Sequence, residues 1–464
     1  MATKDKAKVK VFGYLPNDTP PFGQMVLLGF QHVLTMFPAT VLVALLMGFP
    51  VPTVLLISGV GTILALLGSK LTIGKYIPLY YGSSFSYLAA VMAITKTSFG
   101  ELADPHLLSV VQAGFIATGV INIIVGILIR VAGGKKAIDI ILPPSVTGPV
   151  ACTIGIGLGL AALNNATGIT GPTGGPQVNE FIVALLTLII TICLSVYLQG
   201  KGFIGMLPIL LGAIAGYLIA IPFGLVNITW GDLIRVPTFN FPVFNDPMTL
   251  TAIVGIGIMA IATIPESTAH LYQISLYVDH LAEEQGREKY NLSQYIGLNF
   301  ILDGLDDIVN GLFGSVAGTN YGENNSLMVI TRNYSGPALM TAGVIAILLA
   351  FVGPLADIVQ SMPSAVGGGL SIYLFGVIGM QGIALMISEK VNLYDPRQLA
   401  IGAVILIVGI GGNIGFANSM IPFPVGKVFP DGLPAIAFAA VLGILINLIF
   451  VIFKPPVERK AVNK

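Results

Sequence analysis

The sequence consists largely of apolar runs of about 20 residues, which is the length a helix needs to cross the hydrocarbon core of a bilayer. Only 9% of the residues are charged, against roughly 25% in soluble domains, so the charges are too few to cover a soluble protein of this length. We therefore expect an all-α polytopic membrane protein with about 14 spans. Their expected bounds are 22–47, 51–68, 77–98, 108–131, 140–163, 179–199, 203–224, 249–275, 294–313, 317–335, 337–353, 364–386, 398–416 and 433–453.

The distribution of basic residues predicts the orientation of these spans. If the N-terminus is cytoplasmic, all of the 22 lysines and arginines except Lys96, Arg235 and Lys427 fall on the cytoplasmic side. Cytoplasmic loops carry such an excess of basic residues. We therefore expect an even number of spans, with both termini in the cytoplasm and the protein in the cell (inner) membrane. The N-terminus is polar and rich in lysine and has no cleavable apolar segment, so no signal peptide is expected.

The same composition argues against several other classes of function. The net charge is zero, which gives no electrostatic reason to expect a nucleic-acid partner. Cys152 and Cys193 lie in apolar runs and are expected to be small buried residues. No cluster of histidines and cysteines has the spacing of metal ligands, and no nucleophile–base pair or phosphate-binding loop is visible. We therefore expect neither an enzyme nor a metal or organic cofactor.

Two expected spans open with residues that do not suit a regular membrane helix. The third begins with the segment 77–87 (IPLYYGSSFSY) and the tenth with 314–324 (GSVAGTNYGEN). Each combines β-forming residues, glycines and small polar residues, and they hold equivalent places if the chain consists of seven-plus-seven inverted repeats. Interrupted spans in matching positions of two repeats indicate the binding site of a transporter. Close packing of helices at small residues is the alternative explanation, mainly for the first segment.

Two carboxylates and a histidine lie in this apolar sequence. Glu323 belongs to the second interrupted segment, and Glu266 lies in the eighth expected span with His270 one helical turn after it. A charge at the bilayer centre costs about 2.5–3.5 kcal/mol on insertion scales, so such groups persist where they line a cavity, are paired or carry a proton. Histidine titrates near neutral pH, which suits a proton carrier. A structural hydrogen bond in a helix interface is the alternative for His270.

Further polar residues lie in the first and ninth expected spans. Gln31 and His32 occupy the repeat position equivalent to Glu266, so they could face the same cavity or simply join helices. Asp303, Asp306 and Asp307 form a cluster, and Asp303 and Asp307 share a helix face. This cluster could brace the neighbouring interrupted span or belong to a proton path.

The sequence resembles the nucleobase–ascorbate transporters, also called nucleobase–cation symporter 2, and within them the bacterial uracil permeases. The resemblance extends from GFQHVLTMFPATVLV (29–43) through YGSSFSYLAA (81–90) to NYGENNSLMVITRNYSG (320–336). The last stretch is similar to the family signature, which Glu323, Asn324, Thr331 and Arg332 match. Ser326 replaces the signature glycine. In the usual Glu-His-x-Gly-His pattern, only Glu266 and His270 are retained.

The resemblance implies two domains that move against each other. A core domain would contain residues 1–137 and 247–360 (spans 1–4 and 8–11), and a gate domain 138–246 and 361–464 (spans 5–7 and 12–14). The residues implied to hold the base are Glu266, Glu323, Phe85 and Gly322, and His270 is linked to proton coupling. We add as candidates for substrate binding Tyr321, Ala39 and Ser84, and as supporting residues Gln31, His32 and Asn324.

The resulting expectation is proton-coupled symport of uracil or a related pyrimidine, with the proton as coupling ion. A xanthine or other purine permease of the same family is the alternative. A passive channel is less consistent with two isolated carboxylates, because it predicts a continuous polar stripe. The resemblance also implies a homodimer formed through the gate domains.

Overall fold

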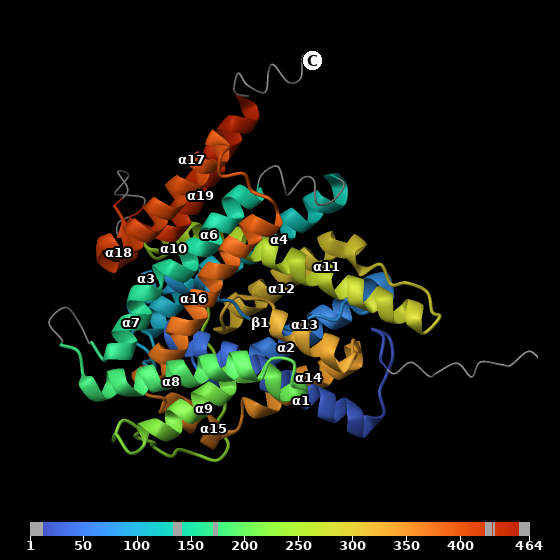
Figure 1. Cartoon of the computed structure of the whole chain (residues 1–464), viewed down its shortest axis with the longest axis horizontal. Coiled ribbons are helices and arrows are strands. Elements are labelled where there is room, and N and C mark those ends of the chain that lie inside the picture. The colour runs from blue at the N-terminus through green and yellow to red at the C-terminus, as the bar shows by residue number, and fades with distance from the viewer. Residues whose placement is uncertain (1–12, 133–141, 170–174, 423–428, 430–431, 454–464) are drawn as a thin grey trace, which may run out of the picture.

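The structure, a computed structural model of the chain, describes residues 13–132, 142–169, 175–422, 429 and 432–453. It is built almost entirely of helices (Figure 1). Among the described residues, nine helices or pairs of consecutive helices are long and apolar enough to cross a membrane. The expected domain boundary at residue 137 lies outside the described residues, as do the terminal basic residues that support the orientation, among them Lys4, Lys6, Lys8, Lys10, Arg459, Lys460 and Lys464.

The first part of the chain follows the expected spans closely. The elements are α1 (Phe22–Met47), α2 (Val51–Ile73), β1 (Tyr81–Ser83), a 3-10 turn (Phe85–Tyr87), α3 (Leu88–Thr95) and α4 (Pro105–Ala132). They are followed by α6 (Pro144–Gly157), α7 (Gly159–Thr167), α8 (Val178–Tyr197) and α9 (Pro208–Ala220). Helix α1 ends where Gly48 takes the left-handed conformation with φ 75°, a conformation that glycine adopts without steric cost.

The second part contains α10 (Thr249–Gly257), α11 (Ala260–Glu284), α12 (Ile296–Phe313), β2 (Gly318–Asn320), α13 (Gly322–Thr331), α14 (Gly336–Leu349) and α15 (Gly353–Gln360). It continues with α16 (Ser364–Ser388), α17 (Pro396–Leu406), α18 (Gly412–Gly415), the short strands β3 (Met420–Ile421) and β4 (Leu433–Pro434), and α19 (Ala435–Ile452). A π-helical segment, Ile407–Gly411, separates α17 from α18.

The helices pack in two sets. Helices α1, α2, α4, α10, α12 and α14 pack against one another, and α6, α7, α8, α9, α16, α17 and α19 form the other set. Strand β1 lies near the centre of the view in Figure 1, with α2, α12 and α13 around it. Its antiparallel partner is β2, in the register Tyr81↔Asn320, Gly82↔Thr319 and Ser83↔Gly318. The two expected interruptions therefore contact each other directly across more than 230 residues of chain.

Several features differ from the expected spans, among them the division of the fifth span at Leu158 between α6 and α7. The eighth span is divided at residues 258–259 between α10 and α11. Helix α11 continues to Glu284, so the connection implied between the expected spans 249–275 and 294–313 is partly helical. The short helix α15 was not expected, because eight residues are too few for a clear periodic pattern. The last-but-one span changes from α-helix to π-helix within a run of apolar residues and glycines.

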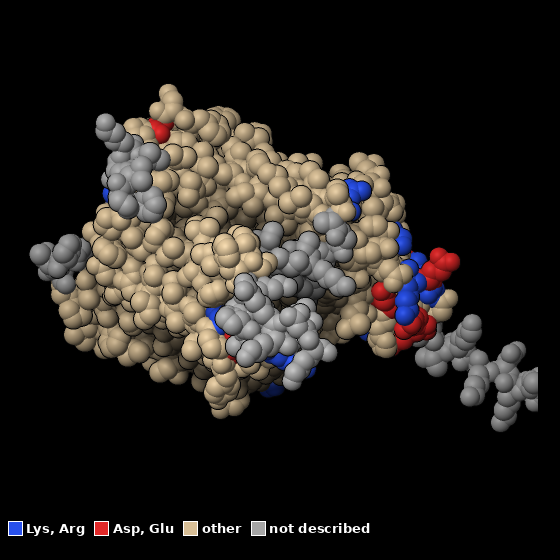
Figure 2. Space-filling model, turned by 90° about the horizontal axis from the view of Figure 1, so that it is seen from above, with Lys and Arg blue, Asp and Glu red and all other residues tan. Residues whose placement is uncertain are grey.

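Charged residues occupy a small part of the surface. In Figure 2 most of the visible face carries neither acidic nor basic side chains, and the densest group of both lies at the right-hand edge. The ion pairs Lys289–Glu283, Arg287–Asp18 and Arg332–Glu284 lie at the end of α11 and in the segments beside it. Exposed apolar residues such as Leu186 and Ile189 cover helices like α8, as expected of surfaces that contact lipid.

Candidate functional site

The candidate site is built around the pair of strands. Each strand is followed at once by a short helix: β1 by the 3-10 turn and α3, and β2 by α13. The strands offer each other backbone hydrogen bonds, and two further bonds extend the pairing, from Ser84 N to Ala317 O (3.1 Å) and from Tyr321 N to Tyr80 O (2.9 Å). The first N–H groups of a helix have no intrahelical acceptor, so both short helices begin with donors available to a ligand.

The extended backbone of β1 is also held from α2. The hydroxyls of Ser58 and Thr62 donate to the carbonyl oxygen of Tyr81 at 2.7 and 3.1 Å, and Thr62 accepts from the Tyr81 N–H at 3.0 Å. These bonds satisfy backbone groups that would otherwise be unpaired at membrane depth, which is the condition for non-helical backbone there.

Glu266 and His270 lie on α11, beside the start of α13. Both side chains are partly buried. The imidazole Nδ1 of His270 lies 2.7 Å from the backbone oxygen of Asn320, the last residue of β2. A Cβ atom added at Gly322 would come within 2.7 Å of His270 Nε2, so only glycine allows α13 to begin this close to the imidazole.

Glu323 lies in the first turn of α13 and its side chain is exposed. It acts electrostatically on both Glu266 and His270, which places these three groups in one neighbourhood. The positive end of the helix dipole favours a carboxylate at this position. The arrangement brings together two carboxylates, one imidazole and the first N–H groups of α13.

The remaining expected substrate-binding residues lie around the strands. The Tyr321 hydroxyl donates to Ser83 O at 3.0 Å and lies 2.9 Å from Thr40 Oγ1 on α1. Its ring closely covers Gly82, where an added Cβ would be 2.6 Å from the ring carbons. The Tyr321 side chain is therefore buried and hydrogen-bonded within the protein, and it offers no exposed surface to a ligand in this conformation. Ala39 and Ser84 are also buried.

Phe85 stands at the boundary between the two sets of helices. It is partly buried and makes an edge-to-face contact with Phe375 of α16, with ring centroids 6.5 Å apart. It is the expected site residue through which the first interrupted segment contacts the second helix set.

The expected supporting residues connect α1 to α13. Asn324 donates to the carbonyl oxygen of His32 at 3.1 Å and lies 3.1 Å from His32 Nδ1. Both side chains are buried. Gln31 Oε1 is buried without a hydrogen-bond partner among the described residues. His32 and Asn324 thus join α1 to α13, whereas the Gln31 amide oxygen keeps its acceptor available.

Four residues near the site were not singled out from the sequence: Ser267, Asn299, Asn320 and Tyr81. The Ser267 hydroxyl accepts from Asn320 Nδ2 at 2.7 Å and from Asn299 Nδ2 at 2.9 Å. The Tyr81 hydroxyl donates to Asn299 Oδ1 at 3.2 Å. This network joins α11, α12, β1 and β2. The available sequence signal was buried amides and hydroxyls within apolar runs, which is weak because such groups also serve ordinary helix packing.

The three aspartates of α12 have different surroundings. Asp307 accepts from the Gly318 N–H at 2.8 Å and from Asn122 Nδ2 at 3.0 Å, so it braces β2 against α4. Asp306 accepts from Asn310 Nδ2 at 3.0 Å. Asp303 is buried, and neither of its carboxyl oxygens has a hydrogen-bond partner among the described residues.

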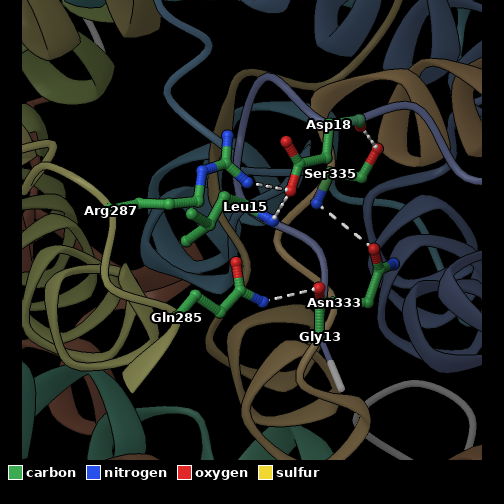
Figure 3. Close-up of polar contacts among 7 residues, drawn as sticks. All are labelled: Gly13, Leu15, Asp18, Gln285, Arg287, Asn333 and Ser335. Atoms are coloured by element: carbon green, nitrogen blue, oxygen red, sulfur yellow. Dashed lines mark hydrogen bonds and ion pairs between the residues drawn. The ribbon is translucent and has the colours of Figure 1, made fainter. Parts of the chain in front are cut away.

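The N-terminal segment is fastened to the connection between α11 and α12, as Figure 3 shows. Gln285 Nε2 donates to Gly13 O at 2.9 Å, and Arg287 forms an ion pair of 2.7 Å with Asp18, which also accepts from the Leu15 N–H at 2.9 Å. The Asp18 carboxylate raises the pKa of Arg287 above its ordinary value, because it stabilises the charged guanidinium.

The same segment holds the end of α13, where Thr331 and Arg332 stand. Arg332 takes a left-handed conformation (φ 52°) that ends the helix, and its carbonyl accepts from the Tyr14 N–H at 3.0 Å. The Ser335 hydroxyl donates to Asp18 O at 2.6 Å (Figure 3). The Thr-Arg part of the signature therefore fixes the far end of α13, while Glu323 stands at the end that faces the candidate site.

The polar site does not coincide with the apolar cavity of the molecule. This cavity of about 300 Å³ lies between α1, α9, α15 and α16 and is lined by residues such as Phe37, Val41, Ala213, Val359 and Leu370, with none of the candidate site residues. Its lining is apolar apart from Tyr217, whose hydroxyl is hydrogen-bonded to Ser361 Oγ, so it is poorly suited to recognise a polar base. No group of three His, Cys, Asp or Glu residues among those described could hold a metal ion.

Chemically, the polar site suits a planar heterocycle that presents N–H and C=O groups in alternation. Carboxylates accept from ring N–H groups, and the first N–H groups of α13 can donate to ring carbonyls. His270 adds an imidazole, which can donate a hydrogen bond from one ring nitrogen and accept at the other.

Comparison with known proteins gives consistent matches over nearly the whole chain. Residues 23–417 match the model of the Permease family. The chain is 35% identical over 443 residues to the uracil permease of Bacillus caldolyticus, covering 93% of each protein. It is 34% identical over 444 residues to the uracil permease of Escherichia coli strain K12, covering 94% of this chain and 93% of that protein.

Solved structures share the fold at low sequence identity. The transmembrane domain of the cyanobacterial bicarbonate transporter BicA superposes with a TM-score of 0.61 at 17% identity, covering 92% of this chain and 99% of that one. SLC26A9 gives a TM-score of 0.64 at 14% identity, covering 93% of this chain and 65% of that one.

Proposed function

The chain belongs to the Permease family, the nucleobase–ascorbate transporters, and we propose that it carries uracil together with a proton across the cell membrane by alternating access. The observation that carries the proposal is the convergence of Glu266, Glu323 and His270 at the start of α13, beside the paired strands. The names of the relatives, uracil permeases over 93% of their length, favour uracil over a purine.

In the proposed binding mode, the two glutamates accept the ring N–H groups of uracil and backbone N–H groups at Gly322 and Phe85 donate to its carbonyl oxygens. Charge-assisted hydrogen bonds of this kind are roughly twice as strong as neutral ones. Phe85 supplies stacking and shape, and its contact with Phe375 links the bound base to the second set of helices.

The proposed transport step is a movement of one helix set against the other. The set containing α1–α4 and α10–α15 would be the core domain and the set containing α6–α9 and α16–α19 the gate domain. The packing of each set within itself supports this division. We further propose that both termini lie in the cytoplasm, that the protein is in the cell (inner) membrane, and that the gate domains form a homodimer.

Proton coupling is proposed at Glu266 and His270. A proton shared by these groups would neutralise the loaded site before it reorients. Moving an uncompensated charge across the membrane potential costs about 2.3 kcal/mol per 100 mV, so neutralisation lowers the barrier to transport. The proton is the only co-substrate proposed.

Uptake of radiolabelled uracil by cells that lack their own nucleobase carriers tests the function. We expect saturable uptake that unlabelled uracil abolishes and that excess xanthine, hypoxanthine or urate leaves nearly intact. Competition by xanthine with no competition by uracil would identify a purine carrier instead. Uptake proportional to concentration without saturation would indicate a channel.

A further inference from the structure

Asp303 is a buried ionisable residue to which the proposed mechanism gives no role. Its side chain is 1% exposed, and neither carboxyl oxygen has a hydrogen-bond partner among the described residues. The Ser267 hydroxyl of α11 lies beside this carboxyl, and Asn299, one helical turn before Asp303, donates to that hydroxyl at 2.9 Å. Asp307, one helical turn later, is by contrast hydrogen-bonded to Gly318 and Asn122.

The groups that surround Asp303 are acidic or neutral. On its own helix they are Asp306 and Asp307, and α11 contributes Glu266. Tyr81 of β1 and Tyr87 beside α3 face it as well. No lysine or arginine among the described residues forms an ion pair with any of these carboxyls. A buried carboxylate without a cation or donors is strongly disfavoured, so a neutral carboxyl that holds a proton suits this position.

The hydrogen bonds of Ser267 limit how that proton is accommodated. A serine hydroxyl donates one hydrogen bond and accepts two. Ser267 already accepts from Asn320 Nδ2 and from Asn299 Nδ2, so it has only its own hydrogen left to offer Asp303. A protonated Asp303 therefore finds no free acceptor on Ser267 unless one of the two asparagines releases it.

We propose that Asp303 binds and releases a proton during transport, and that its protonated form competes with Asn320 for the Ser267 oxygen. A hydronium ion of the aqueous phase gives its proton to a carboxylate oxygen of Asp303 and becomes water. The new Asp303 O–H donates to Ser267 Oγ, and the bond from Asn320 Nδ2 to the same oxygen breaks; no other bond changes. Asp303 and Ser267 are positioning residues in this scheme, because neither touches the substrate.

The consequence reaches the candidate site through Asn320. The same residue holds His270 Nδ1 with its backbone oxygen at 2.7 Å and its side-chain oxygen at 3.3 Å. Releasing the Asn320 amide from Ser267 frees β2 and the imidazole to shift relative to α12. Protonation of Asp303 would thus change the position of the His270 imidazole at the start of α13. This inference rests on the proposed proton-coupled transport.

Infrared spectroscopy of the purified protein without substrate tests the proton on Asp303 directly. A neutral carboxyl has its own C=O stretching band. We expect such a band at neutral pH that disappears in Asp303→Asn and persists in the control Glu266→Gln. An unchanged band in Asp303→Asn would overturn the proposal. Because no uracil is present, this result stands whether or not uracil is the substrate.

Transport in proteoliposomes tests the coupling. A one-proton symporter driven by one pH unit accumulates substrate about tenfold, because both correspond to the same free energy. We expect Asp303→Asn, whose amide donates permanently to Ser267, to exchange internal for external uracil like the parent protein. It should lose the tenfold accumulation. Accumulation equal to that of the parent would overturn the proposal.

Ser267 variants provide the second arm, and they decide the question if Asp303→Asn fails to fold. Ser267→Ala removes the shared oxygen and should flatten the pH dependence of uptake, while exchange of uracil continues. Ser267→Thr retains the hydroxyl and should show the pH dependence of the parent protein. A parental pH profile in Ser267→Ala would overturn the proposal. If the parent protein transports no uracil, the proposed function fails, and the infrared band still tests Asp303.

Discussion

His270 Nδ1 lies 2.7 Å from the backbone oxygen of Asn320, so the histidine of α11 is bonded directly to the last residue of β2. A carbonyl oxygen only accepts hydrogen bonds, and therefore the Nδ1 atom must carry the hydrogen. The other ring nitrogen, Nε2, keeps its lone pair and faces Gly322 at the start of α13. The imidazole can thus take up a proton at Nε2 without breaking its bond to Asn320.

Replacing His270 with Ala should separate binding from accumulation. We expect the variant to bind uracil, because both glutamates remain, but to lose the rise in uptake at low external pH. Uptake measured between pH 5.5 and 8 with and without a protonophore checks this, with membrane abundance as the control. A variant that still concentrates uracil along a pH gradient would make His270 structural.

Replacing Glu323 with Gln should weaken uracil binding severely without unfolding the protein. The carboxylate accepts a charge-assisted hydrogen bond worth roughly 1.5–3 kcal/mol, or about ten- to a hundredfold in affinity, and the amide can replace it only with a weaker neutral one. Binding of labelled uracil to purified protein measures the effect. Glu101→Gln, at an exposed position before α4, is the matched control and should bind like the parent. Parental affinity in Glu323→Gln would remove Glu323 from the site.

Gly322→Pro should impair uptake more than Phe85→Ala. Proline is tolerated in the first turn of a helix, and Tyr321 already has the extended conformation that precedes it (φ −84°, ψ 122°). The substitution nevertheless deletes an N–H donor and places carbon atoms within 2.7 Å of His270 Nε2. Phe85→Ala loses a contact worth on the order of 1 kcal/mol. Equal uptake by the two variants would contradict a ligand bound by the backbone.

Replacing Arg235 with Ala should lower thermal stability. Arg235 forms an ion pair of 2.7 Å with Asp357, whose side chain is 3% exposed, and the loss leaves that carboxylate with the Gly231 N–H alone. We expect the free energy of unfolding to fall by about 1–2 kcal/mol. This is the low end of the range for a charged hydrogen bond, because Arg235 itself is 41% exposed and solvent weakens its interaction. Thermal unfolding in detergent measures this. The exposed pair Lys289–Glu283 is the control, and Lys289→Ala should leave the melting temperature unchanged.

The sequence predicted the apolar helices and the two interruptions because both signals are local. The run 22–47 coincides with α1, and the glycines and small polar residues of 81–84 and 318–322 mark the strands and the start of α13. The pairing of β1 with β2 was not predicted, because nothing local specifies it and the assumption of repeats gave the two interruptions equivalent places without putting them in contact.

The network around Ser267 could not be predicted, because two of its members, Tyr81 and Asn320, are more than 230 residues apart in the chain. Tyr81, Asn299 and Asn320 each resemble an ordinary polar residue in an apolar stretch, and only the tertiary arrangement shows that they share one hydrogen-bond system. The π-helical segment before α18 likewise depends on packing, since its residues are apolar or glycine on either side of the change.

The pairing of β1 with β2 also bears on biosynthesis. Tyr81 is synthesised more than 230 residues before Asn320, its partner in the strand pair. During membrane insertion the first interrupted segment therefore lacks its pairing strand until most of the chain has left the ribosome, and some of its backbone groups are unpaired at membrane depth. Unpaired backbone N–H and C=O groups cost several kcal/mol of free energy each in the hydrocarbon of a bilayer. We therefore expect the early half of the nascent chain to remain shielded by the insertion machinery or by water, and a chain stopped before residue 318 to be recognised as incomplete and degraded.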